Sequence, residues 1–581
     1  MHHYGPELRD GKVRFNIWAP DAPSVTLEVE GAEPVPMQPR LDGFYQAEVA
    51  SGPGARYRFR LPDGLTVPDP ASRLQAEDVH GWSVVTDPGA YTWENRSWRG
   101  RPWHEAVVYE LHAGAFGGFR GIEADLPRLK ALGITAVEIM PVADFPGQHN
   151  WGYDGVLPYA PDRAYGTPDE LRHLIDTAHG MGVMVMLDVV YNHFGPDGNY
   201  LHAYAKRFFD ESKHTPWGAA IDFRRREVRD FFIGNALYWL NEFRFDGLRF
   251  DAVHAISEPD FLDEMAAVIR AQTQGRHVHL VLEHEGNKSS HLTAGFDAQW
   301  DDDVHHCLHV MLTGESEGYY ADFQDAAPLL ARCMAEGFAF QGESTYRGKP
   351  RGEPSGHLPT TAFVICLQNH DQIGNRAFGD RLTQLANPEA LQAATVLLLM
   401  APFIPMLFMG EEWGTKRPFL YFTDHNPELA KLVREGRRRE FEHFAAFSDP
   451  ARRETIPDPN APETFTASIP TPAEAGQPEH AKILALHRDL LALRHRYIVP
   501  RIPGARSEGA SVLGTKAIVA CWRMGDGSLL SIAINLAGDP VPIGPIGGEM
   551  LYGTGERLAL ILREGALPER SAAVYLSEAS R

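Results

Sequence analysis

The chain has 581 residues, of which 44% are hydrophobic, so it is longer than one hydrophobic core normally organises, and about two to four domains are expected. It carries 55 Lys and Arg against 77 Asp and Glu, a formal net charge of −22. This balance argues against nucleic acid or an anionic membrane as the main partner and favours a neutral or cationic ligand.

The first part of the chain, residues 1–95, is predicted to be a small β-sandwich. Short alternating runs at 13–20, 24–31, 43–50 and 55–64 are separated by Pro, Gly and Asp turns, which is typical of such a domain. The chain starts "MHHYGPELRDGKVRFNIW", without an apolar signal core, which indicates a cytoplasmic protein.

From about residue 105, apolar β-type runs alternate with helical patterns such as "PDELRHLIDTAHGMG". Alternating β and α segments predict a parallel sheet, and eight repeats predict a closed (β/α)8 barrel. We place this barrel at residues 96–497, with a short excursion at about 193–229 after the third strand. The eight strands are predicted at 106–114, 134–142, 183–193, 247–254, 278–286, 296–303, 363–371 and 405–413.

Three features complete the chain. The apolar run 393–410 is as long as a membrane span, but Pro402 and Pro405 cut it, so a helix that leads into a buried strand is the better interpretation. The tract 448–479 contains seven prolines and is predicted to be an irregular surface loop. Residues 498–581 return to short strands and are predicted to form a second all-β domain.

The cysteines and a charge run have simple interpretations. Cys307, Cys333, Cys366 and Cys521 lie far apart without a CxxC pair, so neither a disulfide framework nor a zinc knuckle is indicated. "REGRRREFEHF" is interpreted as a solvated helix face.

Polar side chains gather where several predicted strands end. Function in such a barrel lies at the carboxyl ends of the strands. One such residue alone could simply cap the helix that follows, but a set on several strands favours a shared site. The residues are Asp188, Asn192 and His193; Arg249, Asp251 and His254; Glu283 and Glu285; and His370 and Asp371.

The stretch "FRFDGLRFDAVHAI" offers two acids, and strand parity separates them. Arg249 and Asp251 share a face, about 7 Å apart, because successive strand side chains point in opposite directions. Asp246 precedes the strand at its entrance, so a structural role is expected. A neighbouring guanidinium favours the ionised carboxylate, so Asp251 suits a nucleophile.

Glu283 lies in the same zone of the next strand, among apolar residues and near other carboxylates. Its pKa should rise, which suits a general acid. Two acids with separated pKa values, about 5–5.5 Å apart, are what retaining glycosidases use. Neighbouring strands, about 4.8 Å apart, can meet that spacing, and Asp371 is then a third acid placed to bind sugar hydroxyls.

The motifs "DVVYNH", "GLRFDAVH", "LEHE" and "QNHDQIGN" resemble the four strand-end motifs of the α-amylase superfamily, glycoside hydrolase family 13. The resemblance implies that Asp251 is the nucleophile, Glu283 the acid/base and Asp371 the transition-state stabiliser. It also implies sugar-binding roles for His193, Arg249, His370 and Tyr153, the last as an aromatic platform. Further substrate-binding candidates are Trp151, His254, Asp302, His305 and Gln372.

Longer stretches, among them "MPVADFPGQHNWGYDG" and "QNHDQIGNRAFGDRL", are similar to those of the malto-oligosyltrehalose trehalohydrolases over nearly the whole chain. This resemblance implies hydrolysis of the α-1,4 bond next to a terminal trehalose unit, no cofactor, and action after a malto-oligosyltrehalose synthase. Two alternatives stay open: a glucan-branching transferase on the same fold, and a non-catalytic glucan-binding protein.

Two positions depart from the pattern of this family: Asp301 stands where Asn is more often expected, and Cys307 replaces a small residue. Asn192 matches a position that binds calcium in many α-amylases. The segment that follows it is short and poor in oxygen ligands, and "DDDVHH" lacks a metal-ligand spacing, so no bound metal is expected.

Overall fold

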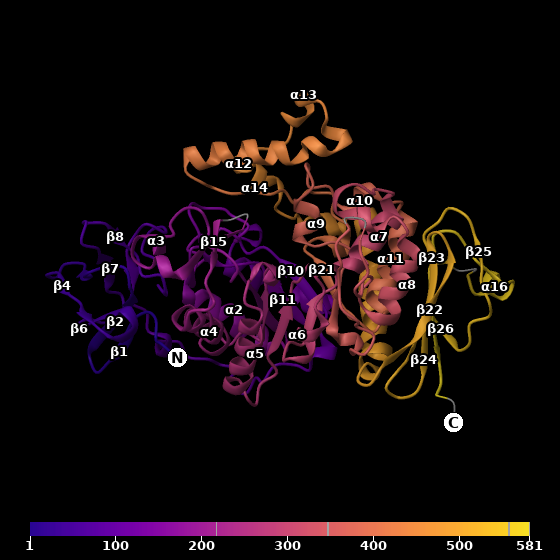
Figure 1. Cartoon of the computed structure of the whole chain (residues 1–581). Coiled ribbons are helices and arrows are strands. Elements are labelled where there is room, and N and C mark those ends of the chain that lie inside the picture. Colours follow the sequence, from indigo (N-terminus) through magenta and orange to yellow (C-terminus); the bar gives the residue numbers. More distant parts are fainter. Residues whose placement is uncertain (216–217, 346–347, 556–557, 580–581) are drawn as a thin grey trace.

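The computed structural model describes residues 1–215, 218–345, 348–555 and 558–579. Figure 1 shows three parts in a row: the N-terminal strands at one end, a barrel in the middle and the C-terminal sheet at the other end. The observed strands fall within the three predicted regions, whose boundaries stay a prediction. None of the helices within the described ranges is both long and apolar enough to span a membrane.

The middle part is a closed barrel of parallel strands, so the predicted fold class is confirmed. Neighbouring strands follow chain order around the barrel, as parallel strands joined by helices do. The barrel strands are β10 (Val108–Leu111), β11 (Ala136–Ile139), β14 (Met184–Val189), β17 (Gly247–Phe250), β18 (His279–Leu282), β19 (Ala298–Trp300), β20 (Phe363–Ile365) and β21 (Ile404–Phe408). Seven of the eight predicted runs contain one strand each, and the eighth overlaps β21, which begins one residue before it.

Helices cover the outside of the barrel. Local signals define some of their ends: α2 begins after Thr167, whose hydroxyl accepts a hydrogen bond from the Glu170 N–H in a capping box with Pro168 at the first position. The run 393–410 forms the end of α11 and then β21, as predicted. The main covering helices are α1 (Phe119–Leu132), α2 (Pro168–Gly180), α4 (Arg226–Asn241), α5 (Asp260–Gln272), α7 (Asp302–Thr313), α8 (Ala326–Glu336), α11 (Pro388–Met400) and α15 (Pro478–Leu493).

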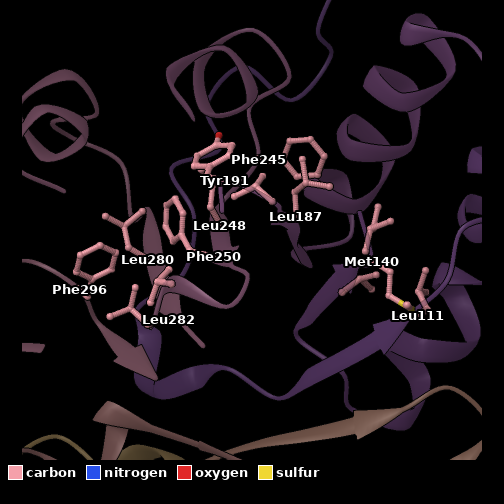
Figure 2. Packing of buried hydrophobic residues seen from close by; sticks show 14 of the residues in the cluster. Leu111, Met140, Leu187, Tyr191, Phe245, Leu248, Phe250, Leu280, Leu282 and Phe296 are labelled. Carbon is pink, nitrogen blue, oxygen red and sulfur yellow. The ribbon is translucent and has the colours of Figure 1, made fainter. Parts of the chain in front are cut away.

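Strand alternation sorts the barrel side chains into two layers. Leu248 and Phe250 point outward and belong to the core between strands and helices, where Figure 2 shows them with Leu280, Leu282 and Phe296. A separate cluster inside the barrel contains residues that alternate with these along the barrel strands, among them Met186, Val281 and Trp300. Arg249 is therefore directed into the barrel, as parity predicted.

Two β regions flank the barrel. In the first, one sheet holds β1 (Glu7–Arg9), β2 (Lys12–Trp18), β5 (Gln38–Pro39) and β6 (Phe44–Val49). The other holds β3 (Thr26–Val29), β4 (Val35–Pro36), β7 (Arg56–Arg60), β8 (Thr66–Val67) and β9 (Ser83–Val84). Phe15 and Tyr57, one from each sheet, have ring centroids 4.6 Å apart, which is how the two sheets meet in a common core.

The C-terminal sheet is antiparallel, in the order β22 (Arg506–Gly514), β23 (Ala517–Arg523), β24 (Leu529–Asn535), β28 (Ser571–Ser577) and β26 (Glu549–Gly553). Its Trp522 indole N–H donates to the backbone oxygen of Met334 at 3.1 Å, which ties this sheet to α8.

The prediction of an irregular loop at 448–479 is wrong in part. The tract contains α13 (Pro450–Arg453) and α14 (Pro462–Ala467), and α15 starts at Pro478. Three of the prolines occupy first helical positions, where no backbone N–H is needed, so they begin helices and do not break them. With α12 (Pro427–Glu440), α13 and α14 form a layer above the barrel (Figure 1).

Candidate active site

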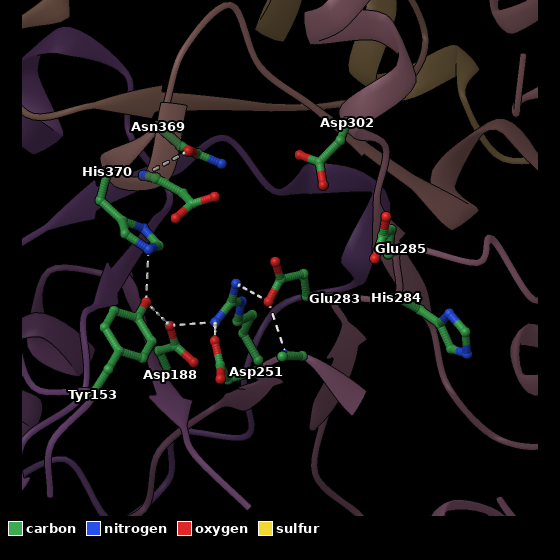
Figure 3. A network of polar contacts seen from close by, with 12 residues as sticks. Tyr153, Asp188, Asp251, Glu283, His284, Glu285, Asp302, Asn369 and His370 are labelled. Atoms are coloured by element: carbon green, nitrogen blue, oxygen red, sulfur yellow. Dashed lines mark hydrogen bonds and ion pairs between the residues drawn. The ribbon is translucent and has the colours of Figure 1, made fainter. Parts of the chain in front are cut away.

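Asp251 and Glu283 stand level with each other at the ends of adjacent strands. Phe250 of β17 pairs with Leu282 of β18, so the next residue on each strand occupies the same height. One guanidinium group joins them: Arg249 Nη1 lies 2.9 Å from Asp251 Oδ1, and Nη2 lies 2.7 Å from Glu283 Oε2. Figure 3 shows the carboxyl groups of Asp251 and Glu283 close to each other.

The electrostatics of the two acids differ, as predicted. Burial alone would raise the pKa of Asp251, but the charges of Arg249 and His193 outweigh it and hold that pKa below its ordinary value. Burial raises the pKa of Glu283 to about 8, against the opposing charge of Arg249 and with the support of Asp251 and Asp371. At neutral pH Asp251 is therefore an anion and Glu283 a proton donor.

Asp246 lies at the other end of the barrel, buried and fully engaged in structure. Its carboxylate accepts hydrogen bonds from the Trp98 indole at 2.7 Å and the Val185 backbone N–H at 2.9 Å, and it pairs with His179 at 2.9 Å. The structural interpretation of Asp246 is confirmed.

A chain of polar contacts extends from Arg249 to the far wall of the opening. Asp188, at the end of β14, accepts from Arg249 Nη1 at 2.7 Å and from the Tyr153 hydroxyl at 2.7 Å. The Tyr153 oxygen also lies 2.9 Å from His370 Nε2. The Tyr153 and His370 rings stack, with centroids 5.2 Å apart (Figure 3). Tyr153 and His370 thus form one wall, opposite Glu283.

Asp371 lies in α9 (His370–Gly374), directly after the loop that follows β20. The Asn369 side chain caps this turn by accepting from the backbone N–H groups of Asp371, at 2.9 Å, and Gln372, at 3.2 Å. Asn375 donates to the Asp371 carboxylate at 2.8 Å. The Gln372 amide donates to Asp302 at 3.0 Å, and burial raises the pKa of Asp302 to about 6.

The interpretation of the charge run as a solvated face is wrong for Arg437 of α12. This side chain is 8% exposed and packs over the Tyr421 and Phe441 rings. It donates to the backbone oxygens of Gly374, at 2.7 Å, and Arg376, at 3.1 Å. The layer above the barrel is therefore fastened to the turn that carries Asp371.

Asn192 faces Asp251. Its amide donates to the backbone oxygen and to the carboxylate of Asp251, both at 2.8 Å. His193 is buried and pairs with the backbone oxygen of Tyr153 at 2.8 Å, so it connects the end of β14 to the wall that Tyr153 and His370 form. Among the described residues, no three or more His, Cys, Asp or Glu side chains are grouped to hold a metal ion. All four cysteines are free thiols.

Two predicted substrate contacts are placed differently by the structure. Trp151 is 4% exposed: it stacks on Phe419, donates to the Leu420 backbone oxygen at 2.9 Å and lies under α9. A Cβ on Gly374 would come within 2.0 Å of its ring. Trp151 thus supports the wall from behind, because the loop before Tyr153 turns its aromatic residue inward.

His305 was predicted to line the cleft, but it is 1% exposed. Its ring pairs with the Leu367 backbone oxygen at 2.6 Å. Strand parity no longer applies there, because α7 begins at Asp302 and its helical period turns His305 inward. His254 is exposed at the rim, and its ring accepts a hydrogen bond from the Glu285 backbone N–H at 3.3 Å.

A closed (β/α)8 barrel that presents these acids at the carboxyl ends of its strands is the architecture of an α-amylase-type glycosidase. Residues 94–233 match the model of the α-amylase catalytic domain, and residues 505–574 match a domain of unknown function, DUF3459. The malto-oligosyltrehalose trehalohydrolase of Rhizobium sp. (strain M-11) is 38% identical over 97% of this chain and 98% of its own length.

The malto-oligosyltrehalose trehalohydrolase of Deinococcus radiodurans is 42% identical over 83% of this chain and 80% of its own length. A crystal structure described as a putative α-amylase from Salmonella typhimurium is 44% identical, covers 99% of both chains and superposes with a TM-score of 0.94. The chain belongs to the malto-oligosyltrehalose trehalohydrolase family. A 1,4-α-glucan branching enzyme of Rhodospirillum rubrum is 33% identical over only 44% of this chain.

Proposed function

We propose that the protein is a retaining glycosidase that cleaves the α-1,4 bond next to the terminal trehalose unit of malto-oligosyltrehalose, releasing trehalose and a malto-oligosaccharide. The observation that carries the chemistry is the pair Asp251 and Glu283, held by one guanidinium group with their pKa values on opposite sides of neutrality. Membership of the trehalohydrolase family carries the substrate.

In the first step the ionised Asp251 carboxylate attacks the anomeric carbon of the glucose residue before the trehalose unit. The bond from that carbon to the glycosidic oxygen breaks, and Glu283 gives its proton to the departing oxygen. Trehalose leaves, and the malto-oligosaccharide remains as an ester of Asp251. The proton on Glu283 is available because burial raises its pKa to about 8.

In the second step Glu283, now a carboxylate, removes a proton from water as the water attacks the same carbon. The ester bond to Asp251 breaks, and the product leaves with the α configuration of the substrate. Two inversions at one carbon give net retention. Arg249 stays between the acids throughout and stabilises whichever of them is charged.

The remaining residues of the wall are assigned to the sugar ring. Tyr153 offers its face to the glucose residue under attack, and Asp371 and His370 hydrogen-bond its hydroxyls. These bonds strengthen as the ring flattens towards the oxocarbenium-like transition state. More distant glucose residues of the substrate are assigned to the side chains at the rim, Asp302, Gln372 and His254.

The chemistry of the substrate places the reaction in a sequence. A trehalose unit at the end of an α-1,4 glucan must first be made from the reducing end, so we place this enzyme after a malto-oligosyltrehalose synthase. A cytoplasmic location goes with that assignment and stays a prediction.

Incubation with maltotriosyltrehalose tests the function. We expect stoichiometric free trehalose and maltotriose, measured by anion-exchange chromatography. Transfer to an acceptor glucan with new α-1,6 branches, and no trehalose, would support a branching transferase in its place. No sugar release from any α-glucan would support a non-catalytic glucan-binding protein.

A further inference from the structure

One buried carboxylate, which is not among the residues assigned to the sugar, makes two hydrogen bonds to His370. Glu110 lies on β10 and is 1% exposed. Its Oε2 accepts from the His370 backbone N–H at 3.0 Å, and its Oε1 pairs with His370 Nδ1 at 2.5 Å. Both carboxylate oxygens thus bind the same residue, His370. These contacts connect β10 to the loop after β20.

We propose that Glu110 is a positioning residue: it holds His370 as a double donor and, through His370, fixes the direction of the hydrogen bonds that orient Tyr153. This inference rests on the proposed function and deepens it, because it concerns the wall of the same site. Glu110 itself lies beneath that wall and is not expected to contact substrate.

The protonation state of His370 decides which groups can donate hydrogen bonds along this chain of contacts. A doubly protonated His370 donates from Nδ1 to Glu110 and from Nε2 to the Tyr153 oxygen. The Tyr153 O–H is then free to donate to Asp188, which lies 2.7 Å away. A neutral His370 would leave Nε2 as an acceptor, so the single Tyr153 proton could serve either His370 or Asp188 but not both.

The surroundings of His370 favour the charged form. Burial would lower the pKa of His370, but the charge and the hydrogen bond of Glu110 raise it to about 9. The adjacent Asp371 raises it further, while Arg249 opposes. The other titratable groups that face the ring are Tyr153, Glu138 of β11 and His112 of the loop after β10.

Substituting Glu110→Gln tests the inference, because it keeps the shape of the side chain and removes its charge. His370 should lose its second proton near neutral pH. We expect kcat at pH 7.5 to fall by roughly tenfold to a hundredfold, by analogy with the loss seen when the hydrogen-bond partner of a metal-ligating histidine is removed. Since His370 regains its proton at lower pH, the optimum of kcat should move to acidic pH by about one unit or more.

Glu138→Gln is the matched control. Glu138 is the register partner of Glu110 on β11, is 2% exposed, and burial raises its pKa well above the ordinary value. Burial favours the protonated form of Glu138, so the uncharged amide should change neither the rate nor the pH optimum. A Glu110→Gln profile that matches that of Glu138→Gln would overturn the inference, and so would a loss of rate that is equal at every pH.

A double-mutant cycle with Tyr153→Phe separates positioning from general damage. If Glu110 acts through the Tyr153 hydroxyl, Glu110→Gln should cost much less in the Tyr153→Phe background, whereas independent effects would multiply and contradict the proposal. If Glu110→Gln does not fold, Glu110→Asp keeps the charge and should retain the wild-type pH optimum. An acidic shift in Glu110→Asp would then contradict it.

The same assays distinguish a failure of the proposed function from a failure of the proposed role of Glu110. They use maltotriosyltrehalose and take the wild-type rate as reference, with maltoheptaose as a second substrate. A wild-type enzyme that releases maltose or glucose but no trehalose refutes the proposed substrate and leaves the role of Glu110 testable. An active wild type whose pH optimum is unaffected by Glu110→Gln overturns only the role of Glu110.

Discussion

Asp251 and Glu283 bind to different nitrogens of the same guanidinium group, Nη1 and Nη2 of Arg249. The two acids therefore share one counter-charge while their pKa values diverge. The difference comes from the other neighbours. Asp251 has the His193 ring nearby and its carboxylate accepts a further hydrogen bond from Asn192, whereas Glu283 has Asp371 and Asp302 close by. This asymmetry supports the proposed roles of Asp251 as the nucleophile and Glu283 as the acid.

The first prediction separates the two aspartates of the repeated Arg-Phe-Asp motif. Asp251→Asn should lower kcat by several orders of magnitude and leave the unfolding midpoint close to wild type, because the amide fits but cannot attack. Asp246→Asn should lower the stability and leave kcat close to wild type. It leaves donors of Val185, Trp98 and His179 competing for one carbonyl oxygen, at a cost of about 1–3 kcal/mol or more.

Steady-state kinetics and chemical denaturation of both variants check this. A large loss of turnover in Asp246→Asn at unchanged stability would reverse the assignment.

The second prediction concerns the pH dependence of kcat/KM. The rate should fall as pH rises through about 8, because Glu283 then loses the proton that the leaving oxygen needs. It should also fall as pH drops through about 6, because Asp188, whose pKa burial raises to about 6, then takes a proton and weakens its contacts with Arg249 and Tyr153.

A pH–rate profile measured between pH 4 and 10 should therefore be bell-shaped, and the residual activity of Glu283→Gln should lack the alkaline limb near 8. An alkaline limb that survives unchanged in Glu283→Gln would show that another group supplies the proton.

The third prediction tests whether the layer above the barrel supports catalysis. Arg437→Met keeps the apolar stem but removes the hydrogen bonds to Gly374 and Arg376. The turn that carries Asp371 should loosen, so kcat should fall by roughly tenfold with a smaller change in KM. Arg439→Met on the same helix is the matched control, because that side chain is exposed.

Kinetics on both variants, with thermal unfolding to confirm that each is folded, provide the comparison. Equal rates in the two variants would mean that α12 does not position Asp371.

The fourth prediction concerns Asp301, the position that departs from the family pattern. Asp301 is 1% exposed, and neither carboxylate oxygen makes a hydrogen bond of normal geometry within the part of the chain that the structure describes. Burial, helped by Asp303 and Asp302, raises the pKa of Asp301 well above its usual value. The folded state therefore favours the protonated form of Asp301.

An acid whose pKa is raised in the folded state costs no stability at pH values below its unfolded-state pKa. As pH rises from the unfolded-state pKa towards the folded-state pKa, the folded protein loses stability relative to the unfolded chain. Asp301→Asn removes that dependence. The variant should gain on the wild type by about 1.4 kcal/mol for each pH unit above about 4, until the folded-state pKa is reached. Urea unfolding at pH 5 and pH 8 measures this gain, and a difference that does not grow with pH would contradict it.

Much of the fold was predictable because its signals are local. Eight apolar runs separated by helical patterns suffice to predict a barrel, and strand parity correctly directed Arg249 inward and Leu248 outward. The pKa order of Asp251 and Glu283 was also predictable, because it depends on near neighbours and on burial in adjacent strands.

The failures occurred where the chain leaves regular strands. Trp151 and His305 sit in a loop and in a first helical turn, where period-2 alternation no longer gives the direction of a side chain. Pro450 and Pro462 looked like loop residues because proline breaks helices, yet both begin one. Arg437 could not be found from its charge run, since only the tertiary contact with Gly374 distinguishes it. Glu110 did leave a signal, a lone acid within an apolar strand.

Proton NMR of the products during the first minutes of reaction tests the central claim most directly. Maltotriosyltrehalose should give free trehalose together with maltotriose whose new reducing end is the α anomer, because Asp251 and Glu283 act by double displacement at one carbon. Initial formation of the β anomer would contradict this, since a single displacement by water would then have occurred and Asp251 could not be a covalent nucleophile.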